Sequence, residues 1–247
     1  MPELTTLDWC LLVVAAAGIG ISKSGLSGLS MVHVLVFASV FGARESTGVV
    51  LPMLIFGDVC AVRAYGQHAN WQQVWRMMPP ALLGVAAAWL WMHRLDEGIY
   101  RPLIGSIILG LTILQIIRLW CSQWQTKIPQ TVWFAWSMGL TVGMTTMLAN
   151  AAGPVFGLYL LALAIPKLEF VGTSAWFFLM LNVFKVPFSW NLGLIDTQSL
   201  QLNIILCPVI IVGMYLGKAI VKRIPQKIFD SLILVFTAVA ALRLLVI

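Results

Sequence analysis

Charged residues are scarce in this sequence, where only 10% of the 247 residues are Asp, Glu, Lys or Arg. A soluble domain carries roughly 25% charged residues, because its surface faces water. Hydrophobic residues make up 60% of the chain, and they recur in runs near or above the roughly 18 residues that cross a bilayer. The shortage of charge therefore excludes a water-facing fold and predicts a multi-pass membrane protein.

The sequence also lacks the motifs of metal sites, nucleotide sites and hydrolases. The four cysteines lie far apart with no CxxC pair, and none of the three histidines has a helical partner at metal-ligand spacing. HExxH, Walker A and dinucleotide motifs are absent. We therefore expect no metal, no cofactor, no enzymatic activity and no ATP-driven transport by this chain alone.

Basic residues exceed acidic ones, giving a formal net charge of +6. They lie mostly between apolar runs, as the positive-inside rule expects, and not in a basic patch interleaved with aromatics. Nucleic acid is therefore excluded as a partner. The first eight residues are acidic and have no basic n-region, so we expect no cleavable signal peptide.

Ten apolar segments are expected to be helical, because lipid leaves other backbone conformations unpaired. They cover residues 7–21, 27–42, 48–65, 77–93 and 99–119, then 131–147, 154–166, 171–189, 200–217 and 227–246. In each set of five, the first two segments are short and are joined by a break. A 15-residue helix is about 22 Å long, less than the bilayer core of about 30 Å. Each short pair is therefore predicted to be a broken or re-entrant helix pair, followed by three spanning helices.

The two sets of five segments align as an internal repeat. Residues 48–62 match residues 172–186 at an offset of 124, which pairs Asp58 with Asn182. Residues 79–95 match residues 208–224, which pairs Gly84 with Gly213. The predicted fold is an all-α transmembrane bundle of two tandem repeats, residues 1–122 and 123–247. If each short pair is a hairpin, three spanning helices per half predict inverted repeats. The distribution of basic residues then places both termini outside and loop 218–227 in the cytoplasm. If each short pair makes one crossing instead, the basic residues divide less unevenly between the two sides, and parallel repeats stay the alternative.

Lys23 lies in the first break and is flanked by Ser22, Ser24 and Ser27. A lysine at membrane depth is costly and marks a functional site by default. The next helix begins near Gly25, so the positive end of its dipole points at the break. An ammonium, hydroxyls and a helix N-terminus together suit a small oxyanion. The alternative is a lysine that snorkels from a helix end.

The second break contains Asn150 and Gly153, followed by a proline suited to a helix start. We expect a second helix N-terminus aimed inward, with Asn150 donating to the anion. The alternative is that Asn150 is a simple N-cap. Thr173 and Ser174 open the segment at 171–189, where they either cap the helix or add hydroxyls to the site.

Four further residues are predicted to line the pathway or couple transport: Asp58, Asn182, Lys185 and His33. Lys185 follows Asn182 by three residues, on the same helical face. Asp58 either carries a proton, lines the pathway or pairs with a buried cation. A structural ion pair of Asp58 with Lys185 or Arg63 is the competing interpretation.

Several stretches share the tandem pattern of a known family. They are the break GIGISKSGLSG at 18–28, the stretch 48–65, the segment 71–84, and NAAGP at 150–154 with FVGTSAWFF at 170–178. On these residues the chain resembles the sulfite exporter TauE/SafE family of membrane transporters. The resemblance implies export of sulfite or small organosulfonates, or uptake of related anions, driven by an ion gradient. Ser27 and Ser30 replace part of the family's glycine run, and His33 stands where the family often has a small or apolar residue.

The sequence thus predicts a multi-pass secondary transporter of the inner membrane that exports a small sulfur-containing oxyanion. Its expected partners are the inorganic or organosulfur anion, protons as the coupling ion, and the lipid bilayer, with a homodimer left open. A passive anion channel is the first alternative. A second is an intramembrane serine protease, because Gly25 and Ser27 belong to a GxSG motif, although a base within reach of the serine is not evident.

Overall fold

The computed structural model of the protein describes residues 4–24, 30–94, 131–163 and 165–221, with residues 99, 102–103, 106–107, 109–110 and 113. Regular structure in this part of the chain is helical throughout, as predicted. Five helical stretches in it are long and apolar enough to cross a membrane: Thr6–Lys23, Glu45–His68, Val132–Ala149, Lys167–Asn191 and Thr197–Ala219. The prediction of a multi-pass helical membrane protein is confirmed at this level.

The helices follow the predicted apolar segments. The first half contains α1 (Thr6–Lys23), α2 (Ser30–Phe41), α3 (Glu45–Val49), α4 (Leu51–Tyr65), the 3₁₀ turn η2 (Gly66–His68) and α5 (Trp71–Met92). The second half contains α7 (Val132–Ala149), α8 (Gly153–Ala162), α9 (Lys167–Asn191) and α10 (Thr197–Val221). The predicted segment 227–246 and most of 99–119 lie outside the described residues.

Two boundaries differ from the prediction for identifiable local reasons. The segment 48–65 is divided at Val50, and α4 begins one residue before Pro52, which has no N–H to give to a continuous helix. Helix α5 begins at Trp71, earlier than the predicted residue 77. The side chain of Asn70 caps it by accepting a hydrogen bond from the Gln73 amide, and such a cap fixes a helix start.

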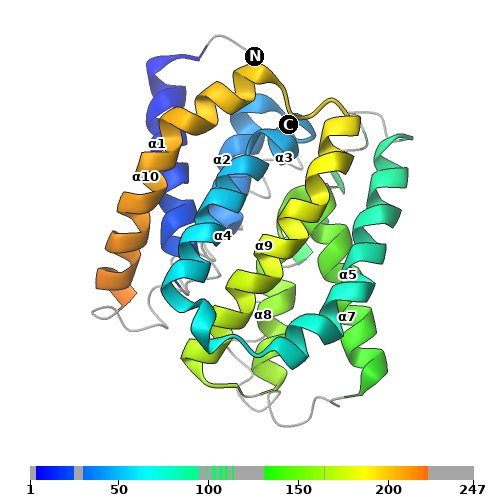
Figure 1. Cartoon of the computed structure of the whole chain (residues 1–247). Coiled ribbons are helices and arrows are strands. Elements are labelled where there is room, and N and C mark those ends of the chain that lie inside the picture. Colours follow the sequence, from blue (N-terminus) through cyan, green and yellow to red (C-terminus); the bar gives the residue numbers. More distant parts are fainter. Residues whose placement is uncertain are drawn as a thin grey trace.

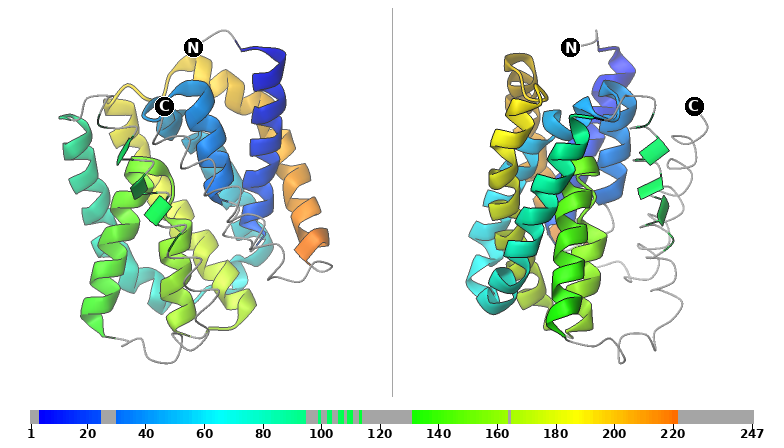
Figure 2. Two further views of the ribbon diagram at one scale, coloured as in Figure 1. Left: turned by 180° about the vertical axis from the view of Figure 1, so that it is seen from behind. Right: turned by 90° about the vertical axis from the view of Figure 1, so that its right-hand side faces the viewer.

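The two short helix pairs enter the molecule from opposite ends (Figures 1 and 2). Helix α1 runs inward from the end where the N-terminus lies, and α2 returns toward that end. Helix α7 runs inward from the other end, and α8 returns there. This arrangement is what inverted repeats require, while the repeats themselves and their boundary between residues 122 and 123 stay a prediction.

Each half packs one helix against the other half: α1 of the first half lies against α10, and α7 of the second half lies against α5. Glycines at both contacts allow the two helix backbones to approach closely. A Cβ on Gly84 would lie 2.3 Å from the carbonyl oxygen of Leu140, and one on Gly213 would lie 2.3 Å from that of Ala17. Gly84 and Gly213 are the residues that the repeat alignment pairs. Helices α4 and α9 pack together between these pairs.

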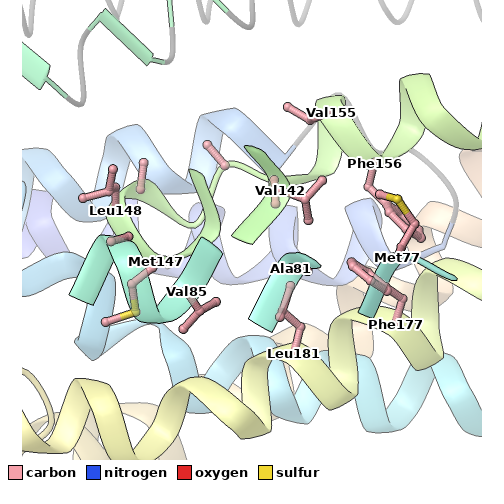
Figure 3. Close-up of a cluster of buried hydrophobic side chains, with 14 of the residues drawn as sticks. Met77, Ala81, Val85, Val142, Met147, Leu148, Val155, Phe156, Phe177 and Leu181 are labelled. Carbon is pink, nitrogen blue, oxygen red and sulfur yellow. The ribbon is translucent and has the colours of Figure 1, made fainter. Parts of the chain in front are cut away.

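A hydrophobic cluster holds α5, α7, α8 and α9 together (Figure 3). Met77, Ala81 and Val85 from α5 belong to this cluster, together with Val142 from α7. Where α8 meets α9, the rings of Phe156 and Phe177 stack with centroids 4.1 Å apart. Offset-stacked aromatic pairs of this kind contribute roughly 0.5–1.5 kcal/mol beyond the area that they bury. The cluster therefore fixes α7, α8 and α9, three of the helices that form the site described next.

Candidate functional site

A cavity of about 80 Å³ lies among α1, α2, α4, α7, α8 and α9. A cavity needs roughly 10–15 Å³ of such space for each water molecule, so this one has room for a small anion. Both predicted breaks reach it, through Lys23 at the end of α1 and Gly153 at the start of α8. Its polar lining consists of Ser22, Lys23, Ser30, His33, Asp58, Thr146, Asn150, Ser174 and Asn182.

Asp58 is the buried carboxylate of this site. It is fully buried, and its two oxygens have different partners. Lys23 donates from Nζ to Oδ1 at 2.5 Å, and Asn182 donates from Nδ2 to Oδ2 at 2.7 Å. The ion-pair interpretation with Lys185 or Arg63 is therefore wrong about the partner, which is Lys23. The last turn of α1 suits this lysine, because a cation there is favoured by the helix dipole.

Lys185 is the second cation, and it lies behind the cavity wall with an exposed fraction of 1%. Its Nζ donates to Asn150 Oδ1 at 2.5 Å, and to the carbonyl oxygen and Oγ1 of Thr146 at 2.9 and 3.1 Å. A longer contact of 3.4 Å reaches Asn182 Oδ1. All these acceptors are neutral. The free carbonyls at the C-terminus of α7 favour a cation at this point.

Asn150 ends α7 instead of starting the next helix, so its interpretation as an N-cap is wrong. It is the C-cap, with a left-handed backbone (φ 51°), and its amide N–H bonds to the Thr146 carbonyl at 3.0 Å. Asparagine adopts this conformation more readily than most residues. Its side-chain Nδ2 donates to the Thr47 carbonyl at 2.9 Å. Asn150 thus orients Lys185 and joins α7 to α3, while also lining the cavity.

Gly153 begins α8 on the cavity wall. The first N–H groups of a helix have no acceptor within that helix and carry its positive dipole end. The expectation of an inward-facing helix N-terminus at the second break therefore agrees with the geometry. The corresponding residues of the first break, Gly25 and Ser27, lie outside the described residues.

The serine hydroxyls are oriented differently from the prediction. Ser22 and Ser174 line the cavity, but they donate their hydrogens to the carbonyls of Ile19 and Phe170, each at 2.8 Å. They present lone pairs and not O–H groups to an occupant. Ser24 donates in the same way and is not part of the cavity lining.

Thr173 does not line the cavity either. Its Oγ1 accepts a hydrogen bond from the Asn70 amide at 2.9 Å, so it supports the start of α5. Because α9 begins at Lys167, neither Thr173 nor Ser174 caps that helix, and the capping interpretation is wrong. The sequence pattern suggested a helix start there because Gly172 precedes them. In the structure Gly172 lies within α9, where the absence of a side chain lets the helix approach the Tyr65 carbonyl closely.

His33 is buried on the cavity wall, with an exposed fraction of 1%. Among the described residues, neither of its ring nitrogens has a hydrogen-bond partner. Buried polar groups are normally paired, so such a residue needs an explanation. The described part of the chain contains no group of three or more His, Cys, Asp or Glu that could hold a metal ion.

Two contributors were not predicted from the sequence. The ring of Phe178 lies 5.3 Å from Lys23 Nζ, which gives a cation–π contact within the usual limit of about 6 Å. Thr146 supplies two oxygens to Lys185. Its position four residues before Asn150 places both on one face of α7, which is the signal that would have identified it.

A family model described as Sulfite exporter TauE/SafE matches residues 10–244. The match extends over both breaks and all the residues of the polar network. Comparisons with curated proteins and with solved structures give no match.

Proposed function

Since this chain belongs to the sulfite exporter TauE/SafE family, we propose that it is a secondary transporter of a small sulfur-containing oxyanion. The substrate would be sulfite or an organosulfonate, exported across the inner membrane with protons as the coupling ion. Lys23, Asn182 and the α8 N-terminus would hold the anion in the cavity. Asp58 would take part in coupling.

The charge balance of the cavity carries this proposal. Within the described residues, Lys23 and Lys185 are the two lysines of the buried network, and Asp58 is its one carboxylate. One positive charge is left without a compensating side chain in a low-dielectric site. Burying a charge is costly unless it is paired. A bound monovalent anion would neutralise the site, and anion binding in the cavity would therefore be electrostatically favourable.

The arrangement of the helices supports a carrier with alternating access. Two short helix pairs enter from opposite ends and meet at the cavity. Transporters with inverted repeats place the site at the repeat interface, where broken helices direct their ends at the substrate. Rocking of one half against the other would then expose the cavity to each side in turn.

The test is anion flux in proteoliposomes containing the purified full-length protein. Sulfite, sulfate, sulfonates and carboxylates are offered in turn, and each is measured with and without unlabelled anion on the opposite side. A carrier gives saturable uptake with counterflow. Conduction without saturation or counterflow would instead establish the channel alternative.

Variants of the network test the charge argument directly. Lys23→Gln reduces the net charge of the network by one and should abolish measurable anion binding. The double variant Lys23→Gln/Asp58→Asn restores the excess positive charge and should recover part of the affinity. Arg63→Gln, an exposed cation in the last turn of α4, is the matched control and should bind as the wild type does. Unchanged affinity in Lys23→Gln would refute the proposed role of the cavity.

A further inference from the structure

We propose that the cavity selects its oxyanion in a singly protonated form, a monoanion with one hydroxyl, and that His33 recognises that hydroxyl. This inference rests on the proposed function and specifies the protonation state of its substrate. It follows from which hydrogen-bonding groups the cavity has left unused.

The cavity wall presents several acceptors that a fully deprotonated oxyanion could not use. Ser22 and Ser174 have donated their hydrogens to helix carbonyls and offer only lone pairs. Asp58 offers only acceptors as a carboxylate, and its two known donors leave further lone pairs. An occupant with acceptors alone would face these oxygens without hydrogen bonds. An occupant with one O–H can donate to them.

Donors are also present, and they suit the unprotonated oxygens of the same anion. The ammonium of Lys23 carries three hydrogens, and Asp58 accounts for one of them. The Nδ2 group of Asn182 carries two, and Asp58 again accounts for one. The N-terminus of α8 adds backbone amides at Gly153. The site therefore combines donors with acceptors.

His33 is the residue that can distinguish the hydroxyl of such an anion from its unprotonated oxygens. A neutral imidazole presents one donor and one acceptor nitrogen. Both nitrogens of His33 are buried and lack partners among the described residues, and the side chain lies on the cavity wall. The hydroxyl of such an anion would donate to the acceptor nitrogen, whereas a sulfonate has no hydrogen to donate and could satisfy only the donor nitrogen.

The charges around His33 set the charge of the occupant. The groups that face this region are Lys23 from α1, Asp58 from α4 and, behind the wall, Lys185 from α9. They leave an excess of one positive charge. A dianion would leave the buried site with a net negative charge. The occupant class is therefore a protonated oxyanion of charge −1, such as hydrogensulfite.

Two probes of matched shape and charge test this inference. Methylphosphonate carries one hydroxyl and one negative charge at a suitably chosen pH, and methanesulfonate carries the same charge with no hydroxyl. Binding of each is measured to the purified full-length protein in nanodiscs at that pH. The wild type should bind methylphosphonate about tenfold more tightly, since pairing a buried nitrogen that methanesulfonate leaves unpaired contributes about 1.4 kcal/mol.

Variants of α2 assign the preference to His33. His33→Leu should lose most but not all of the preference for methylphosphonate, because the remaining acceptors on the wall are still present, and should still bind methanesulfonate. His33→Gln should retain part of the His33 contribution, because an amide also donates and accepts. Ser39→Ala changes an exposed hydroxyl on the same helix and should leave the preference intact. Retained methanesulfonate binding shows that His33→Leu is folded.

The outcomes separate this inference from the proposed function. Equal affinity of the wild type for both probes, or an equal loss of both in His33→Leu, would overturn the role of His33 and leave anion transport standing. Binding of neither probe by the wild type would overturn both proposals.

Discussion

The side chains of Asp58 and Asn182 form a hydrogen bond that joins the two halves of the chain. The contact joins positions 124 residues apart, which is the offset of the repeat alignment. Each side chain also reaches a lysine, Asp58 through its ion pair and Asn182 through its Oδ1. Removing one partner of a buried pair typically costs 3–5 kcal/mol, because the other charge is left uncompensated.

An exchange of these two side chains tests their coupling. Asp58→Asn leaves Lys23 without its carboxylate, and Asn182→Asp places two carboxylates in contact. Asp58→Asn should lower the free energy of unfolding by roughly 3–5 kcal/mol, and Asn182→Asp should lower it to the extent that the repulsion between the two carboxylates exceeds the gain from a second counter-ion. The double variant keeps one carboxylate and one amide and moves the carboxylate next to Lys185. Thermal unfolding of the four proteins in detergent forms a double-mutant cycle, in which the double variant should regain about half of the loss.

Additive losses in that cycle would show that the two positions act independently. Anion flux as a function of pH provides a separate measurement on the Asp58→Asn protein. A profile identical to that of the wild type would exclude a coupling role for Asp58.

The identity of the site residues was accessible from the sequence, but their partners were not. Lys23, Asp58 and Lys185 could be singled out because ionisable side chains at membrane depth are rare and costly. Which cation meets Asp58 depends on how α1, α4 and α9 cross, and no local pattern contains that information. The direction of the Ser22 hydroxyl, in contrast, is set locally by the Ile19 carbonyl three residues earlier in its own helix.

At the scale of helices, the hydrophobic runs and the breaks between them correctly predicted which helices form in the described residues and in which order they follow. The interruptions near Lys23 and Asn150 lie at the ends of α1 and α7, as expected. The predicted helix boundaries were wrong where a single side chain determines the helix start, as Asn70 does for α5. The packing partners of the helices could not be predicted from the sequence either, because α1 packs on α10 and α7 packs on α5 through residues that are far apart in the chain.

The close glycine contacts between helices give a prediction about packing. Gly84→Ala and Gly213→Ala each place a Cβ against backbone, which cannot move aside as a side chain can. Each should destabilise the protein by roughly 1–3 kcal/mol, as overpacking does. Gly110→Ala is the control, because a Cβ there meets nothing within 4 Å. Melting temperatures in detergent give the comparison, and an unaffected Gly84→Ala protein would contradict the packing described here.

For the whole molecule, the basic residues agree with one orientation in the bilayer. Arg63, Lys167 and Lys218 lie near the end where α4 finishes and α9 begins, while Arg44 and Arg94 lie near the opposite end. The positive-inside rule assigns the first end to the cytoplasm. On that assignment the N-terminal end of α1 would face outward, and this orientation stays a prediction.

Cysteine labelling tests this orientation. In a background with the four native cysteines replaced by serine, Gln67→Cys and His93→Cys place exposed thiols at opposite ends of the molecule. A membrane-impermeant maleimide should label His93→Cys in intact cells and Gln67→Cys only in inside-out vesicles. The reverse pattern would invert the assignment, and labelling of both from one side would refute it.

The contact between Asp58 and Asn182 also bears on how such a chain could arise. A gene duplication would initially place identical side chains at these positions, so that each residue met its own copy. Two carboxylates in contact would repel, and two amides would leave the lysines without a counter-ion. If the predicted repeat arose in this way, divergence at this contact would have relieved that conflict, and relatives should exchange acid and amide between the two positions together.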